Sequence, residues 1–384
     1  MASRNFGILF SFIFFFKKTL IITFITLFLF LLFDIFFGKK FYEYLIELEN
    51  KNIQKKAESD NLHLKNSYYF SDLAPSYNGV DMWWSTRVTN NKIIYCTDKN
   101  SFRTSCTNTT RNSKEFDIFI IGDSNGEGQG VLFENTFAGL LENYLINKNI
   151  KVANLSMGGY SPTTYYLKIK KKLEENYKFN EVIIFIDVSD IQDEATLWEL
   201  DDNDLLVLKD VSRKYDPKLK TDNLKKKIKE NLPLTHKYIL VKIKYSLMKF
   251  PKYYEKNFSR YGWTYLDKEN LLDYPGGLDK AINQALTSLN KLQILLKKNE
   301  IKFSLAIYPL PAQILYDEKN NLQVKIFSEF CEGKCHKFYN LYNPFFDEVE
   351  KFGREHVFKN FYIKNDVHLN EFGHKLIFDN IKNN

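Results

Sequence analysis

The sequence predicts an α/β fold in which a parallel sheet is covered by helices on both faces. From residue 114 onward, short apolar runs alternate with longer segments whose apolar residues recur at helical spacing. The apolar runs are continuous rather than alternating with polar residues, which is typical of strands buried on both faces. At 384 residues, the chain is long enough for one sizeable core and an appended segment.

The first expected element is an apolar helix near the N-terminus. Thr19–Gly38 is twenty residues long with a single acid, Asp34, and this length spans a bilayer as a helix. No small-residue cleavage motif follows it, so we expect an uncleaved anchor. Basic residues before the span favour a cytoplasmic N-terminus and an exported remainder. A buried core helix is the alternative, although the segment has no amphipathic face.

A juxtamembrane helix is expected over 41–58, followed by an irregular polar region that extends to residue 113. This region contains the stretch DMWWSTRVTNNKIIYC, which is rich in aromatics but has no clean period. It is interpreted either as a stalk or as a lead-in strand packed on the main domain.

The four cysteines form two local pairs beyond the apolar segment. Cys96 and Cys106 are ten residues apart, and Cys331 and Cys335 are four apart. Two disulfides are expected, and they agree with an exported domain. Half a zinc site in CEGKC and free thiols are the alternatives, but no matching pair of ligands stands near CEGKC in the sequence.

The main domain is expected to alternate strands and helices. The predicted strands are 116–122, 151–156, 181–187, 301–309 and 337–342. The predicted helices are 133–149, 161–175, 278–299 and 370–384. Ser161 is the expected N-cap of the second of these helices, with Pro162 at its first position.

The charged, Lys- and Tyr-rich segment 192–277 interrupts this rhythm, and we expect a helical insertion that contains a lysine-rich helix. We expect it to be a cap over the carboxyl edge of the sheet, with its lysines either solvated or gripping an anionic polymer. The predicted organisation is therefore an anchor over 1–40, a juxtamembrane helix and stalk over 41–113, and a main domain over 114–384.

The composition argues against nucleic-acid binding. The net charge of +7 is modest, and no basic stripe with interleaved aromatics is present. No cofactor or metal is expected either. The glycine-rich stretch GDSNGEGQG lacks the lysine of a P-loop, and its evenly spaced glycines have the wrong register for a dinucleotide fingerprint.

Two interpretations of this stretch remain: a purely structural turn, or a turn after a strand that presents Ser124 as a nucleophile. A serine nucleophile needs a base that is itself oriented by a carboxylate. His368 is the candidate base, because Asp366 stands two residues before it in a polar loop that leads into the last helix. The other histidines lack this context: His63, His236, His336, His356 and His374.

Four ordered blocks resemble the SGNH/GDSL hydrolase superfamily: GDSNGEGQGV, NLSMGGY, FIDVSDIQDE and NDVHLNEFGH. The resemblance implies a flavodoxin-like three-layer α/β/α sandwich. It also implies that Ser124 is the nucleophile, His368 the general base and acid, and Asp366 its orienter. The oxyanion hole would use the backbone N–H groups of Ser124 and Gly159, with Gly158 as the neighbouring candidate.

Two departures from the family pattern bear on the site. Ser189 stands where the family usually has an asparagine that is the third oxyanion donor, beside Asp187 and Asp190. The acid precedes the histidine by two residues rather than the more usual three. The shorter spacing is similar to that of polysaccharide O-acetyltransferases related to alginate acetylation.

These features predict a membrane-anchored, extracytoplasmic serine esterase acting on O-acyl esters. Cell-envelope glycans are the first expected substrate class and lipids the second. An O-acetyltransferase that receives its acyl group from a membrane partner is one alternative. A non-catalytic envelope assembly protein with a degenerate fold of this type is the other.

Overall fold

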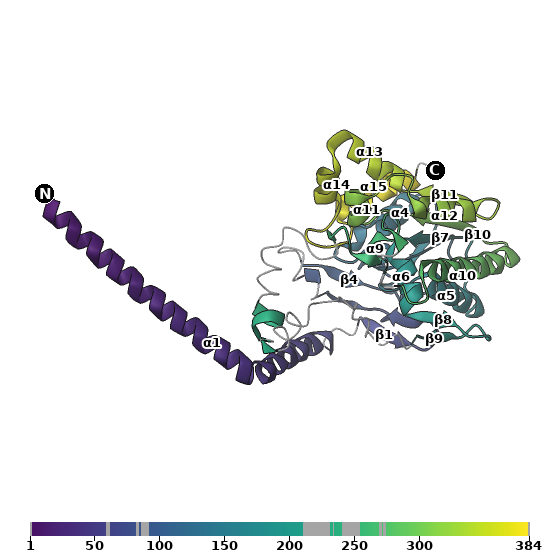
Figure 1. Ribbon diagram of the computed structural model, residues 1–384. Coiled ribbons are helices and arrows are strands. Elements are labelled where there is room, and N and C mark those ends of the chain that lie inside the picture. Colours follow the sequence, from purple (N-terminus) through teal and green to yellow (C-terminus); the bar gives the residue numbers. More distant parts are fainter. Residues whose placement is uncertain are drawn as a thin grey trace. The chain divides into compact units, whose positions relative to one another are not determined.

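The computed structural model describes residues 2–58, 62–81, 84–85, 92–209, 231–232, 234–239, 254–268, 271 and 274–382. The chain divides into two compact units, one made of 1–57 with 216–249 and the other of 58–215 with 250–384. Figure 1 shows the elements of both units.

In the first unit, the expected anchor and juxtamembrane helix form one element, α1 (Ala2–Glu58). Its stretch Phe15–Leu45 is long and apolar enough to cross a membrane, a property shared by anchors and signal sequences. Asp34 is buried. Its carboxylate accepts hydrogen bonds from the backbone N–H groups of Leu234 (2.9 Å) and Thr235 (2.7 Å), at the start of a short π-helix. The single acid of the apolar segment is thus bonded to backbone donors.

The second unit is built on a five-stranded sheet in which all neighbouring strands are parallel. Its strands, in spatial order, are β11 (Lys337–Asn340), β10 (Lys302–Ile307), β7 (Glu181–Ile186), β5 (Ile118–Ile121) and β6 (Val152–Asn154). Numbered along the chain, this is the flavodoxin-like order 2-1-3-4-5. The predicted α/β fold with a central parallel sheet is confirmed, and all five predicted strands are present.

Helices pack in two groups with the sheet between them (Figure 1). One group contains α5 (Pro162–Glu174), α6 (Ser189–Thr196) and α10 (Leu278–Lys298). The other contains α4 (Phe137–Ile146), α13 (Tyr342–Phe352), α14 (Arg354–Phe361) and α15 (Glu371–Ile381). Two shorter helices, α11 (Pro311–Tyr316) and α12 (Leu322–Cys331), follow β10.

Sequence signals explain where these helices start and which face they bury. Helix α5 begins at Pro162 after the N-cap Ser161, which forms a capping box with Thr164. The long helix α10 buries a stripe at helical spacing: Ala281, Ala285, Leu289, Leu292 and Leu296.

The described part of residues 62–113 packs on the sheet domain rather than standing apart as a stalk. It forms two small antiparallel pairs, β1 (His63–Asn66) with β2 (Phe70–Leu73) and β3 (Asn78–Val80) with β4 (Ile94–Cys96). The backbone N–H of Arg103 then donates to Asn154 O at 3.1 Å, which pairs Arg103 with the edge strand β6. Of the two earlier interpretations, the packed lead-in segment describes this arrangement.

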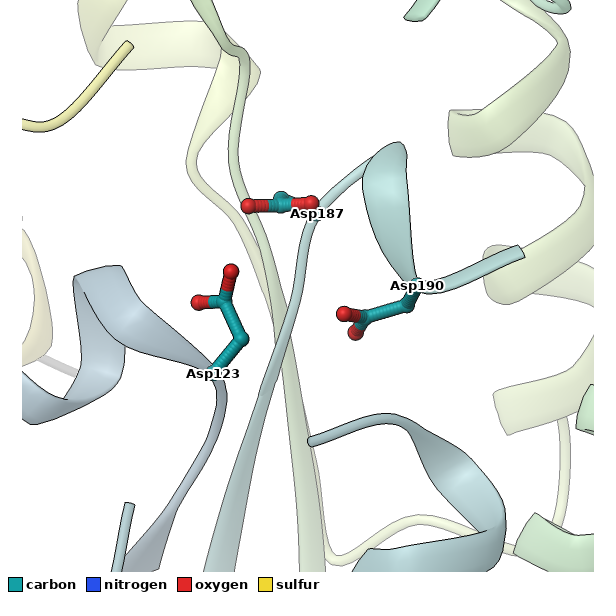
Figure 2. A group of neighbouring side chains, drawn as sticks. All are labelled: Asp123, Asp187 and Asp190. Carbon is teal, nitrogen blue, oxygen red and sulfur yellow. The ribbon is translucent and has the colours of Figure 1, made fainter. Parts of the chain in front are cut away.

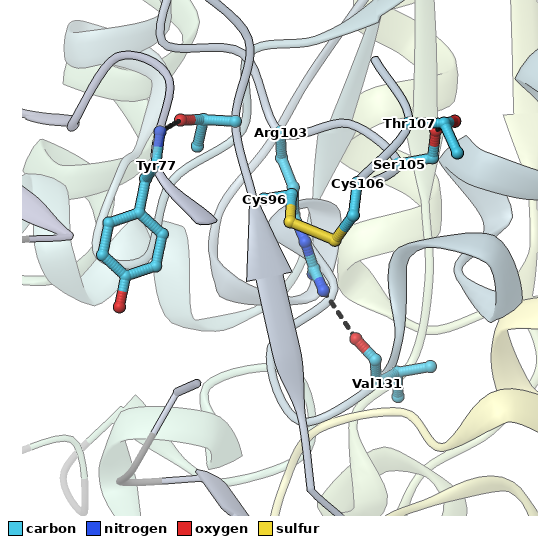
Figure 3. Close-up of a disulfide and its surroundings, with 8 residues drawn as sticks. Tyr77, Cys96, Arg103, Ser105, Cys106, Thr107 and Val131 are labelled. Carbon is cyan, nitrogen blue, oxygen red and sulfur yellow. Dashed lines mark hydrogen bonds between the residues drawn. A yellow bond between two sulfur atoms is a disulfide. The ribbon is translucent and has the colours of Figure 1, made fainter. Parts of the chain in front are cut away.

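Both expected disulfides are present. The S–S distance is 2.11 Å between Cys96 and Cys106 and 2.01 Å between Cys331 and Cys335. The first closes a loop of the lead-in segment (Figure 3). No cysteine in the described chain is left as a free thiol or as a ligand for zinc.

The insertion begins with a short hairpin, β8 (Trp198–Leu200) and β9 (Leu206–Leu208). Most of 210–253, including the lysine-rich helix predicted there, lies outside the described residues. Further along, the short helix α9 (Ser259–Gly262) is followed by Trp263, whose indole N–H donates to Val188 O at 2.8 Å. The last part of the insertion therefore lies at the carboxyl end of β7.

Candidate active site

The carboxyl ends of the parallel strands bring the candidate residues to one edge of the sheet. Ser124 begins the one-turn helix α3 (Ser124–Glu127) just after β5. Gly159 lies in the turn after β6, and Ser189 begins α6 after β7. Asp366 and His368 occupy the loop before α15. This edge is where open α/β sheets bind their ligands.

Ser124, His368 and Asp366 form a hydrogen-bonded chain. The Ser124 Oγ atom is 2.8 Å from His368 Nε2. The other ring nitrogen, Nδ1, is 2.5 Å from Asp366 Oδ1. The side chains of His368 and Asp366 are 13% and 10% exposed, so the pair is largely shielded from water while the serine remains accessible. This is the arrangement of nucleophile, base and orienting acid in a serine hydrolase.

The nucleophile sits on a tight turn that its own neighbours hold. Asp123 caps α3 by accepting the Asn125 N–H at 3.0 Å, and the helix ends at Gly128 with φ +80°. Asn125 then reaches across to the histidine loop, where its Oδ1 accepts the Leu369 N–H at 2.9 Å. A single buried amide therefore ties together two loops that are 244 residues apart.

Two aromatic residues that we did not predict complete the surroundings of the histidine and its acid. Trp84 packs edge-on against the His368 ring, with a centroid distance of 4.8 Å. The Tyr254 hydroxyl donates to the backbone carbonyl of Asp366. Trp84 belongs to the aperiodic aromatic stretch and Tyr254 to the insertion, so neither carried a signal that would connect it with the site.

The oxyanion donors predicted by resemblance are also at this edge. Within the described residues, the N–H groups of Ser124 and Gly159 donate no hydrogen bond. The neighbouring Gly158 N–H, in contrast, donates to Glu127 Oε2 at 2.7 Å. Of the two adjacent glycines, Gly159 is therefore the one whose N–H is available to an incoming oxygen. Its φ of +79° is a left-handed conformation that favours glycine.

Ser189 makes a different contact from the expected one. Its hydroxyl donates to Asp187 Oδ1 at 2.6 Å, and its backbone N–H donates to the same oxygen at 2.6 Å. A serine hydroxyl has one proton to donate, and here Asp187 accepts it. A role for Ser189 as third oxyanion donor stays a prediction, and it requires the hydroxyl to rotate away from Asp187.

Beneath the nucleophile lies a group of three buried acids, Asp123, Asp187 and Asp190, whose carboxylates face one another (Figure 2). One oxygen from each lies within 4.8 Å of the other two, close enough to hold a metal ion. Protein donors already occupy most of these oxygens. The Tyr308 hydroxyl, for example, donates to Asp123 Oδ1 at 2.9 Å and to Asp187 Oδ2 at 3.3 Å.

Two of the three, Asp123 and Asp190, are held away from their charged forms. Burial, together with the negative charge of Asp187, raises the pKa of Asp123 well above its ordinary value. Burial and the charges of Asp187 and Asp123 do the same to the pKa of Asp190. The raised pKa values favour the neutral forms of Asp123 and Asp190, and a neutral carboxyl does not oppose an oxyanion near the nucleophile.

Two other histidines, His374 and His356, make contacts outside this chain of groups. His374 is buried, and its Nδ1 accepts the Phe137 N–H at 3.3 Å, so it supports the start of α4. Burial lowers the pKa of His374 to about 3, which keeps the ring neutral. His356 packs on Phe352 with a centroid distance of 4.9 Å. The side chain of His236 lies outside the described residues.

Comparisons with known proteins give fold likenesses only. No family model matches the chain, and no curated protein matches it. Similar solved structures include a psychrotrophic esterase EstA from Pseudoalteromonas sp., at 14% identity and a TM-score of 0.35, covering 71% of this chain and 96% of that one. TesA has 10% identity and a TM-score of 0.37, and the match covers 70% of this chain and 96% of that one. AlinE4, an SGNH-hydrolase family esterase, has 13% identity and a TM-score of 0.34, and the match covers 71% of this chain and 96% of that one.

Proposed function

We propose that this protein is a serine esterase of the SGNH type that acts on O-acyl esters. The observation that carries the proposal is the chain from Ser124 Oγ to His368 Nε2 (2.8 Å) and from His368 Nδ1 to Asp366 Oδ1 (2.5 Å). An imidazole whose Nδ1–H is held by a carboxylate presents a basic Nε2 to the hydroxyl. A structural serine in a turn has no need of such a partner.

The geometry supports the following sequence of steps. Ser124 Oγ attacks the ester carbonyl carbon while His368 Nε2 takes the hydroxyl proton. The carbonyl oxygen becomes an oxyanion, which the N–H groups of Ser124 and Gly159 stabilise. His368 then gives its proton to the departing alcohol, leaving an acyl-serine. Water activated by the same imidazole adds to this ester and releases the acid and free serine.

The substrate class follows from the expected location. The apolar stretch Phe15–Leu45 supports anchorage in a membrane. The pairs Cys96–Cys106 and Cys331–Cys335 support an oxidising, extracytoplasmic compartment for the sheet domain. O-acylated glycans of the cell envelope are the esters that such an enzyme would meet, and lipid esters come second. Neither nucleic acid nor a cofactor has a place in this mechanism.

The test is release of p-nitrophenol from its acetate ester by the full chain in detergent micelles, with Ser124→Ala beside it. We expect Ser124→Ala to release p-nitrophenol no faster than buffer alone. Equal rates for the two proteins would refute the proposal and favour a non-catalytic assembly role. An isotope-labelled acyl donor and added oligosaccharides, followed by mass spectrometry, then distinguish hydrolysis from transfer. Label found on a sugar would show that a hydroxyl, rather than water, resolves the acyl-serine.

A further inference from the structure

We propose that Glu127 is a positioning residue that sets the oxyanion hole by holding the Gly158–Gly159 turn. The inference rests on the proposed function and adds a residue to it. Glu127 is the last residue of α3, the same helical turn that begins with Ser124. One rigid turn would therefore set the nucleophile and, through its last side chain, the donor on the neighbouring loop.

The contacts of Glu127 are those of an anchor. Its side chain is 1% exposed. Oε2 accepts the Gly158 N–H at 2.7 Å and Gln129 Nε2 at 3.0 Å, and Oε1 accepts the Tyr95 hydroxyl at 2.6 Å. A buried carboxylate with donors on both oxygens has a fixed orientation, and the backbone N–H that it accepts is fixed with it.

The turn needs such an anchor because it consists of two consecutive glycines. Glycine explores a wide range of backbone angles, so a free Gly158–Gly159 pair would sample many orientations of the Gly159 N–H. A Cβ at Gly158 would lie 2.6 Å from Gln129 Nε2, so a side chain there would displace the amide that donates to Glu127. Holding the Gly158 N–H leaves the next N–H as the one free to meet substrate.

Burial alone would raise the pKa of Glu127. Nearby groups outweigh burial and lower the pKa to about 2: the His63 imidazole, the Tyr95 hydroxyl and the guanidinium of Arg103. His63 Nε2 is 4.0 Å from Glu127 Oε1. Glu127 is therefore an ionised acceptor, which makes its hydrogen bond to Gly158 stronger than one to a neutral partner.

The lead-in segment supplies the groups that hold Glu127. The fully buried Arg103 donates to Glu127 O and, through Nη2, to Val131 O at 2.5 Å (Figure 3), so it holds the chain on both sides of residues 128–130. Arg103 lies in the loop closed by the disulfide between Cys96 and Cys106.

The far side of the same turn is held in a similar way. The hydroxyl of Tyr160, the residue after Gly159, donates to Ser71 O at 2.5 Å. Ser71 also belongs to the lead-in segment, in β2. The segment that precedes the sheet domain is thus part of the frame of the oxyanion hole.

The test compares Glu127→Ala and Glu127→Gln with the wild type in the full chain, using p-nitrophenyl acetate. We expect Glu127→Ala to lower kcat by about 100-fold with KM changed less than about threefold, since a misplaced oxyanion donor acts on the transition state. Glu127→Gln keeps one amide oxygen for Gly158 and should lose only about 10-fold in kcat. If Glu127→Ala does not fold, Glu127→Gln and Tyr95→Phe carry the test, both with reduced kcat.

A second readout separates positioning from mere stability. The inhibition constant of a boronic acid that mimics the tetrahedral intermediate should rise in Glu127→Ala by about the factor lost in kcat. The matched control is Glu142→Ala. It removes a largely buried glutamate of α4 that pairs with Arg111. The control should lower the melting temperature and leave both kcat and boronate binding unchanged.

The outcomes separate the two proposals. Wild-type turnover that does not depend on Ser124 would overturn the proposed function. An active wild type together with a folded Glu127→Ala or Glu127→Gln whose kcat and boronate affinity stay within threefold would overturn the positioning role alone. An equal loss of kcat and boronate affinity in Glu142→Ala would also overturn the positioning role, because lowered stability would then explain the effect.

Discussion

The orienting role of Asp366 gives the sharpest test of the site. In Asp366→Asn, the side chain keeps its shape but loses its charge. In the wild type, the Asp366 carboxylate accepts the His368 Nδ1–H at 2.5 Å and the His368 backbone N–H at 3.2 Å. An asparagine amide can donate to Nδ1 instead, which moves the ring proton to Nε2 and removes the base that faces Ser124.

The magnitude follows from these two effects. Losing a charge-assisted hydrogen bond to a shielded imidazole costs roughly 1.5–3 kcal/mol, or about 10- to 100-fold in rate. The wrong tautomer adds a further factor, so we expect kcat to fall by about 10³- to 10⁴-fold. KM should change little, because the histidine acts on the transition state rather than on substrate binding.

The assay is steady-state hydrolysis of p-nitrophenyl acetate, with Ser124→Ala giving the background rate. Asp379→Asn on α15 is a matched control, since it removes a carboxylate paired with Lys375 and Lys382 outside the site. It should keep wild-type kcat. A kcat for Asp366→Asn within threefold of the wild type, in a protein with an unchanged melting curve, would refute the assigned role of Asp366.

Three further changes test the surroundings of the site. Gly159→Ala adds a methyl group that meets no atom within 4 Å, so its cost of ~1 kcal/mol comes from the left-handed backbone alone. As the turn relaxes, kcat should fall about 10-fold, and an unchanged kcat would count against the Gly159 N–H as an oxyanion donor. Asn125→Ala leaves the Leu369 N–H without its acceptor and should lower the free energy of unfolding by ~1–3 kcal/mol and kcat with it; urea melts with no change would contradict this. The folded-state pKa of His374 is about 3 against an ordinary 6.5, so the wild-type free energy of unfolding should decrease as pH falls from 6.5 towards 3, by up to ~1.4 kcal/mol per pH unit. His374→Gln should flatten that dependence, and parallel curves for the two proteins would show that His374 is not its source.

Much of the fold could be predicted because it depends on local patterns. Continuous apolar runs separated by amphipathic segments indicate strands buried between helices, and Ser161 with Pro162 indicates where α5 begins. The expected disulfides are also local, since each joins cysteines no more than ten residues apart. Whether the region before residue 114 stands apart or packs could not be predicted, because that depends on surfaces of β6 and α5 that are formed only in the folded domain.

For the candidate site, the residues could be predicted from local motifs, but the contacts between loops could not. A serine after the first strand and an Asp-x-His pair before the last helix are local motifs, so the sequence alone determined the identities of Ser124, Asp366 and His368 as candidates. Their approach to hydrogen-bonding distance was a consequence of parallel strands that end at one edge. Which glycine keeps a free N–H, and that Glu127 accepts the other, was decided only by the tertiary structure. Such contacts join side chains to backbone groups on separate loops, and no spacing along a chain encodes the direction in which a backbone N–H points.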